Sequence, residues 1–201
     1  MMSMTRLCVV IGFTAFLFCR LTAISVAVDI AGWEVPKQSS ERIVIPVSEE
    51  ELMDKAKQAL SAAGAESSSI NKVDLDEYGT VYVAWRNDTC TPVFARFVAR
   101  RVPCGDCHDV FFLYTFDDAK IIEFIPVSIT KRYNKEWNQS DVRKIESRFA
   151  GKKLEQPVSF NPFVDAIASA TMSSKIVFNS LNETQTVCRK LAEMGYTDKR
   201  K

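Results

Sequence analysis

A chain of 201 residues with 47% hydrophobic, 10% aromatic and 25% charged residues can bury the core of one domain of moderate size. The formal net charge is +1, and loss of residues 1–27 with Arg6 and Arg20 would change it to −1. This balance excludes the strongly basic surface that is typical of nucleic-acid-binding proteins. No Ser-His-Asp set and no metal-peptidase motif occurs, which disfavours hydrolysis.

Residues 1–27 have the pattern of a secretory signal peptide. Arg6 precedes an apolar run over residues 7–18, and 25–27 is a small-x-small cleavage sequence. Arg20 disfavours a stable membrane anchor, because a charge at the bilayer centre costs about 2.5–3.5 kcal/mol on insertion scales. We therefore expect export to the periplasm or to the outer face of the cytoplasmic membrane. An uncleaved leader would add membrane association.

The first half of the exported chain predicts a helix followed by strands. Residues 28–42 carry no periodic signal, and 43–47 are expected to form a short strand. Ser48 begins a capping-box pattern for a helix that Gly64 ends. Strands are then predicted from β-branched and aromatic residues or from alternating polarity, over residues 80–85, 92–102, 109–116 and 120–127.

The second half predicts helices. Ser140 begins a helix that Gly151 ends, residues 160–163 form a turn, and one final helix runs from near Ala170 to Leu191. The expected fold is α+β, a small and mostly antiparallel sheet packed by helices. We expect a signal peptide at residues 1–27 and an N-terminal segment with an amphipathic helix at 28–77. The main domain is expected at 78–195 and a basic tail at 196–201.

The segment 165–171, Asp-Ala-Ile-Ala-Ser-Ala-Thr, resembles the flavinylation motif of the FMN-binding domain family. That motif reads Asp-x-x-Ser/Thr-Gly-Ala-Thr, and its last Thr forms a phosphoester with FMN. Asp165, Ala170 and Thr171 match, whereas Ala168 replaces Ser or Thr and Ser169 replaces Gly. The order of the elements predicted between residues 109 and 181 also resembles that of the family. The resemblance covers roughly a third of the chain.

The resemblance implies an exported electron carrier, more than a substrate-specific enzyme, with covalent FMN on Thr171. Its partners would be redox proteins and the flavin transferase that attaches the cofactor. A Thr in the first turn of a helix also suits a phosphate, because unpaired amides and the positive dipole end lie there.

The neighbours of Thr171 have expected roles as well. Ser169 and Ala170 are small enough for close approach of the backbone, and Ser173 and Ser174 could add hydroxyl contacts. Asp165 could order the turn or bind a divalent cation. Because Ser169 stands where the family has Gly, we expect an ordinary backbone conformation at residue 169.

A second motif, Cys104-Gly105-Asp106-Cys107-His108, has the spacing of covalent c-type haem, with the only His of the chain as axial ligand. The alternative function is therefore a monohaem electron carrier, although this motif normally opens a helix and a strand is predicted after it. A Cys104–Cys107 disulfide or redox pair, disulfides with Cys90 and Cys188, and a zinc site of Cys90, Cys104, Cys107 and His108 stay open. A cofactor-free binding domain stapled by disulfides is the remaining class.

Overall fold

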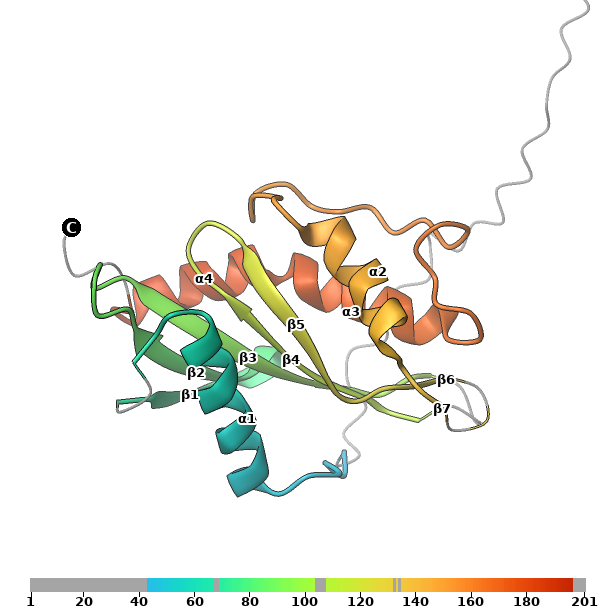
Figure 1. Cartoon of the computed structure of the whole chain (residues 1–201), viewed down its shortest axis with the longest axis horizontal. Helices are drawn as coiled ribbons and strands as arrows, with labels where there is room; N and C mark the ends of the chain where they lie inside the picture. The colour runs from blue at the N-terminus through green and yellow to red at the C-terminus, as the bar shows by residue number, and fades with distance from the viewer. Residues whose placement is uncertain (1–42, 67–68, 104–107, 132, 134, 197–201) are drawn as a thin grey trace, which may run out of the picture. The chain divides into compact units, whose positions relative to one another are not determined.

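A five-stranded antiparallel sheet lies at the centre of the structure, a computed structural model that describes residues 43–66, 69–103, 108–131, 133 and 135–196. Each strand pairs with the next in the chain (Figure 1), and the order is β1 (Asn71–Leu75), β2 (Gly79–Trp85), β3 (Pro92–Arg100), β4 (Val110–Phe116) and β5 (Ile121–Ser128). Phe97 of β3 lies opposite Leu113 of β4. The predicted signal peptide and residues 197–201 lie outside the described residues.

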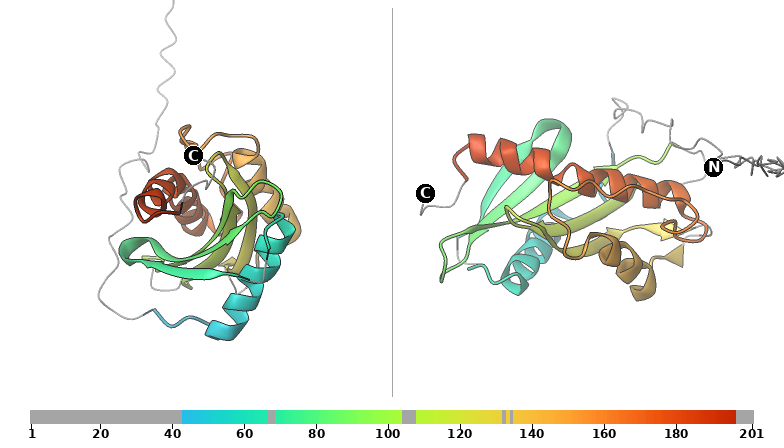
Figure 2. Two further views of the ribbon diagram at one scale, coloured as in Figure 1. Left: turned by 90° about the vertical axis from the view of Figure 1, so that its left-hand side faces the viewer. Right: turned by 90° about the horizontal axis from the view of Figure 1, so that it is seen from above.

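Helices cover both faces of this sheet. One face is covered by α1 (Glu49–Ala62), and the other by α3 (Thr171–Asn182) and α4 (Thr184–Glu193), as Figure 2 shows. Helix α2 (Gln139–Phe149) packs beside the edge strand β5. The short helix η2 (Asp76–Tyr78) joins β1 to β2, and a hairpin of β6 (Thr130–Lys131) and β7 (Lys135–Glu136) precedes α2. The α+β prediction is confirmed.

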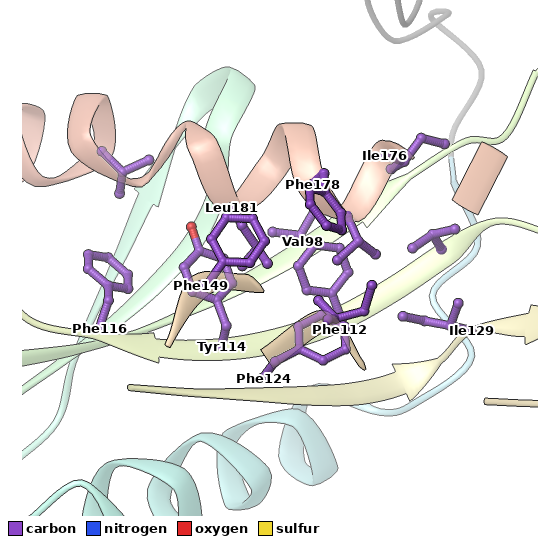
Figure 3. Packing of buried hydrophobic residues seen from close by; sticks show 14 of the residues in the cluster. Val98, Phe112, Tyr114, Phe116, Phe124, Ile129, Phe149, Ile176, Phe178 and Leu181 are labelled. Atoms are coloured by element: carbon purple, nitrogen blue, oxygen red, sulfur yellow. The ribbon is translucent and has the colours of Figure 1, made fainter. Parts of the chain in front are cut away.

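Alternation along the strands separates two hydrophobic cores. Phe112 and Tyr114 of β4 point to α3, whereas Leu113 points to α1. The α1 core is filled by small and aliphatic helix residues, Leu52, Ala56 and Leu60. The core under α3 is richer in aromatic side chains, which Figure 3 shows between the sheet, α2 and α3; the ring centroids of Phe112 and Phe124 are 5.2 Å apart, and those of Phe149 and Phe178 are 5.1 Å apart.

Three elements differ from the predictions. Residues 43–47 do not form a strand. Asn71–Leu75 forms β1 although its sequence is mostly polar, because it pairs with β2. The single final helix is divided into α3 and α4 at Glu183. No helix within the described part of the chain has the length and apolar character needed to span a membrane.

Candidate functional site

Thr171 is the first residue of α3, and its side chain is exposed. The residue before it, Ala170, occupies the N-cap position and has no side chain that could accept a hydrogen bond from the first turn. The first backbone bond of the helix runs from Ser174 N to Ala170 O, at 2.9 Å. The amides of the first turn therefore have no side-chain cap, and the Thr171 hydroxyl lies beside them.

Ser169 has a left-handed backbone, with φ at 62°. Our expectation of an ordinary conformation at this position was wrong. A left-handed conformation costs an L-residue other than Gly about 1–2 kcal/mol. The structure thus has at Ser169 the backbone that favours glycine, at the position where the flavinylation motif has glycine. The strained bend lies two residues before Thr171.

Asp165 is buried and closes the turn that leads to this bend. Its Oδ2 accepts a hydrogen bond of 2.7 Å from Asn161 N. Its Oδ1 lies 2.8 Å from Nε of Arg148, whose side chain is 40% exposed. The N–H of Arg148 Nε is not directed at Oδ1, so this contact is an ion pair without a hydrogen bond. Of the two predicted roles of Asp165, the geometry supports ordering of the turn, since both carboxylate oxygens face protein groups.

Ser174, one of the two serines expected to add a hydroxyl contact, fixes the bend to the helix. Ser174 Oγ accepts a hydrogen bond from Ile167 N and donates one to Ala170 O, both at 2.9 Å. The predicted Ser173 is buried beside it. The signal for Ser174 in the sequence is its spacing of four residues from Ala170, because helical Ser often bonds to the carbonyl four residues earlier.

Helix α2 holds the same turn from outside. Lys144 Nζ donates to Ala166 O at 2.8 Å, and Arg148, one helical turn further along α2, pairs with Asp165. Ile167 and Ala170 are buried in the core, whereas Ala168 and Thr171 are exposed. Burial of Ile167 and Ala170 and the contacts from Lys144 and Arg148 therefore hold the turn in place, and the Thr171 side chain is exposed to solvent.

The opposite end of α3 contains a buried polar network that sequence reasoning missed. Arg96 of β3 is fully buried, and Figure 3 shows Tyr114 in the core beneath α3. Nε of Arg96 donates to Tyr78 O at 2.7 Å, Nη1 to the Tyr114 hydroxyl and Ser180 O, both at 3.0 Å, and Nη2 to Glu183 Oε2 at 2.7 Å.

Thr184 extends this network. Its hydroxyl donates to Leu181 O at 2.5 Å and lies 3.0 Å from the Tyr114 hydroxyl. Since Thr184 has one proton and gives it to Leu181 O, the Tyr114 hydroxyl donates to Thr184 Oγ1. Two carbonyls in the last turn of α3, those of Ser180 and Leu181, thereby accept hydrogen bonds from side chains.

The described cysteines are free thiols. Cys90 is exposed, and Cys188 Sγ donates to Asp117 O at 3.5 Å. Burial, together with nearby carboxylates led by Asp118, raises the pKa of the Cys188 thiol to about 12. Cys104 and Cys107 lie outside the described residues. His108 is exposed just before β4, and the strand that we predicted after the C-x-x-C-H motif is confirmed.

Two further features lie apart from Thr171. Within the described ranges, no group of three or more His, Cys, Asp or Glu side chains could hold a metal ion.

A cavity of about 200 Å³ lies between β5 and α2. Burial and the neighbouring Glu146 raise the pKa of Glu123 on its wall. None of the predicted site residues lines this cavity.

Compared with the models of known protein families, with curated proteins and with solved structures, the chain has no match in any of the three. The fold defines the class of the protein as α+β with a five-stranded antiparallel meander. Its function is therefore inferred from the residues of the site.

Proposed function

We propose that this protein is an exported flavoprotein that carries FMN in a phosphoester bond to Thr171 and transfers electrons between redox partner proteins. The observation that carries this proposal is the left-handed backbone of Ser169, two residues before an exposed Thr at the start of α3. Strained backbone persists where the surrounding structure holds it in place, and it clusters at functional sites. This conformation is what the glycine of the flavinylation motif would allow.

The residues around Thr171 fit a tethered phosphate. The uncapped first turn of α3 offers backbone N–H groups and the positive end of the helix dipole to phosphate oxygens. Ala170 adds no bulk there. Because the Thr171 hydroxyl is exposed, a flavin transferase could reach it. FMN, when bound, would supply one- and two-electron transfer.

The attachment of FMN to Thr171 is a group transfer that needs no oxidant or reductant. Thr171 Oγ loses its proton to solvent and forms a bond to the FMN phosphorus of a flavin dinucleotide donor. The pyrophosphate bond of the donor breaks, and a nucleoside monophosphate leaves with the bridging oxygen. Asp165, Asn161 and Ser174 take no part in this exchange; they hold the turn so that the acceptor hydroxyl stays beside the first-turn amides.

The alternatives have less support. The residues after His108 form β4, whereas a c-type haem motif normally opens a helix. Cys90 and Cys188, two of the four cysteines considered for a disulfide framework, are free thiols.

The test is the intact mass of the full chain produced in a host that has a flavin transferase and exports the protein. We expect a mass increase of one FMN less one water, flavin absorbance near roughly 370 and 450 nm, and a modified peptide that contains Thr171. Thr171→Ala should abolish the adduct, and Ser173→Ala should keep it. A colourless wild-type protein would refute the proposal, and an adduct that survives in Thr171→Ala would refute the assigned residue.

A further inference from the structure

Two neighbouring apolar side chains project into solvent beside the Thr171 turn. Phe163 is 88% exposed, the most exposed large hydrophobic residue in the described part of the chain, and Val164 is 55% exposed. The Phe residues of the sheet strands are buried. Isolated exposed apolar residues are common on protein surfaces, but an adjacent pair on one turn forms a local apolar tip.

The tip is held rigidly. Phe163 N donates to Asn161 Oδ1 at 3.0 Å, and Asn161 O accepts from Val164 N at 3.0 Å and from Asp165 N at 2.7 Å. Asn161 N in turn donates to the buried Asp165 carboxylate, at 2.7 Å. These four hydrogen bonds fix the backbone, so Phe163 stays extended from the surface.

A second exposed aromatic residue lies at the same end of the sheet. Tyr133, between β6 and β7, is 79% exposed. Helix α2 connects the two tips: Lys131 of the hairpin pairs with Asp141 in its first turn at 2.5 Å, and Lys144 contacts Ala166 near the Phe163 turn. Figure 1 shows the β6–β7 hairpin and the loop before α3 at this same end.

Basic side chains lie on the two elements that carry and connect these tips, β7 and α2. Arg143 and Lys144 of α2 and Lys135 of β7 are exposed, and none of them pairs with a carboxylate of the described residues. The acidic groups nearby are mostly engaged: Asp141 with Lys131, and Asp165 with Arg148. Glu136 on β7 is the exposed carboxylate of this end.

We propose that this end of the molecule docks on the surface of an anionic phospholipid bilayer. Phe163, Val164 and Tyr133 would enter the interfacial layer, and Lys135, Arg143 and Lys144 would face lipid phosphates. A protein partner fits less well, because protein interfaces need a contiguous apolar centre with a complementary shape. Separate projecting tips with basic residues between them suit a fluid, planar and negatively charged surface. This inference does not rest on the flavin at Thr171.

The test places a reporter on the tip itself, so that the result does not depend on whether the leader is cleaved. The exported full-length protein is prepared as Phe163→Trp, and Met194→Trp is the matched control. Met194 is 54% exposed and follows α4, which runs toward the opposite end of the sheet (Figure 1). Each variant is mixed with phosphatidylcholine vesicles that contain phosphatidylglycerol and brominated acyl chains.

Bromolipid should quench the added Trp and shift its emission to the blue in Phe163→Trp, but not in Met194→Trp. The effect should weaken about five-fold or more without phosphatidylglycerol or at high salt, since exposed charges are then screened. Phe163→Asp with Val164→Asp should reduce the vesicle-bound fraction of protein by a similar factor, whereas Met194→Asp should not. Equal quenching at both positions, or equal binding to neutral and anionic vesicles, would overturn the proposal.

Discussion

The two ends of α3 are built in opposite ways. At its C-terminal end, the buried Arg96 reaches Ser180 O and Glu183, and the carbonyl of Leu181 is paired with Thr184. At its N-terminal end, Ala170 offers no side-chain cap, Ser169 is left-handed and the Thr171 hydroxyl is open to solvent. One end is closed by internal hydrogen bonds, whereas the other keeps donors available for a ligand.

This difference separates a structural role from the functional role that we propose for the start of α3. A satisfied buried network rigidifies a fold, and its removal leaves charges without partners. Uncapped amides at a helix start carry a smaller penalty, because water can reach them. The helix is therefore fixed to the sheet at Glu183 and presents its other end on the turn that Asp165 orders.

The largest effect should come from Arg96→Met, which removes the centre of the closed end. Ser180 O and the Tyr114 hydroxyl would lose the N–H groups of Arg96, and Glu183 would keep only Arg100. The free energy of unfolding should fall by about 3–5 kcal/mol. Urea denaturation measures it. Arg100→Met is the control, since Arg100 also pairs with Glu183, at 3.3 Å, but is less deeply buried. Equal losses in the two variants would show that burial of Arg96 is not what matters.

Asp165→Asn should have the next largest effect, on the open end. The amide oxygen could still accept from Asn161 N, but the charge that faces Arg148 would be lost, so we expect a loss of about 2 kcal/mol. Amide exchange should accelerate over residues 161–170 and not in β3. Asp54→Asn, on the exposed surface of α1, should change stability by less than about 0.5 kcal/mol. Uniform acceleration across the sheet would contradict this role.

Tyr114→Phe should lower the free energy of unfolding by only about 1 kcal/mol at neutral pH. The reason is that the hydrogen bonds from Arg96 to Ser180 O and from Thr184 to Leu181 O remain. Burial raises the pKa of Tyr114 above its ordinary value of 10.0. The unfolded chain therefore loses this proton first, and the stability of the wild type falls as the pH rises above about 10. The variant should lose less stability in that alkaline range. Denaturation at a series of pH values measures this, and parallel curves would refute it.

The smallest expected effect is an increase in stability. Ser169→Gly relieves the left-handed strain and should raise the free energy of unfolding by about 1 kcal/mol, after the greater flexibility of Gly in the unfolded chain is subtracted. Ser173→Gly, the same substitution inside α3, should instead lower the free energy of unfolding by about 0.5 kcal/mol. Thermal unfolding compares the two. A loss of stability in Ser169→Gly would mean that the Ser side chain stabilises the bend.

Local patterns predicted most of the sheet and the starts of α1 and α3, whereas α2 begins after its cap Asn138 and not at the predicted Ser140. Strands β2 to β5 were found from alternation and β-branched or aromatic residues, and α1 from the Ser48 cap, whose Oγ accepts from Glu51 N at 3.1 Å. Strand β1 was missed because Asn71 and Lys72 are polar and its strand character depends on pairing with β2. The break at Glu183 was missed because the apolar pattern continues, while Arg96 and Thr184 end α3 from outside.

Local properties of the chain, namely binary patterns, caps and short motifs, were enough to predict the α+β class and to single out the segment that leads to Thr171. Three features could not be predicted in this way: the left-handed backbone of Ser169, the burial of Asp165 against α2 and the burial of Arg96 beneath α3. Each of these depends on residues distant in the chain, such as Arg148 for the turn and Glu183 for Arg96. A strained turn or a buried charge is stable only when such partners surround it, and their meeting is a property of the packed fold.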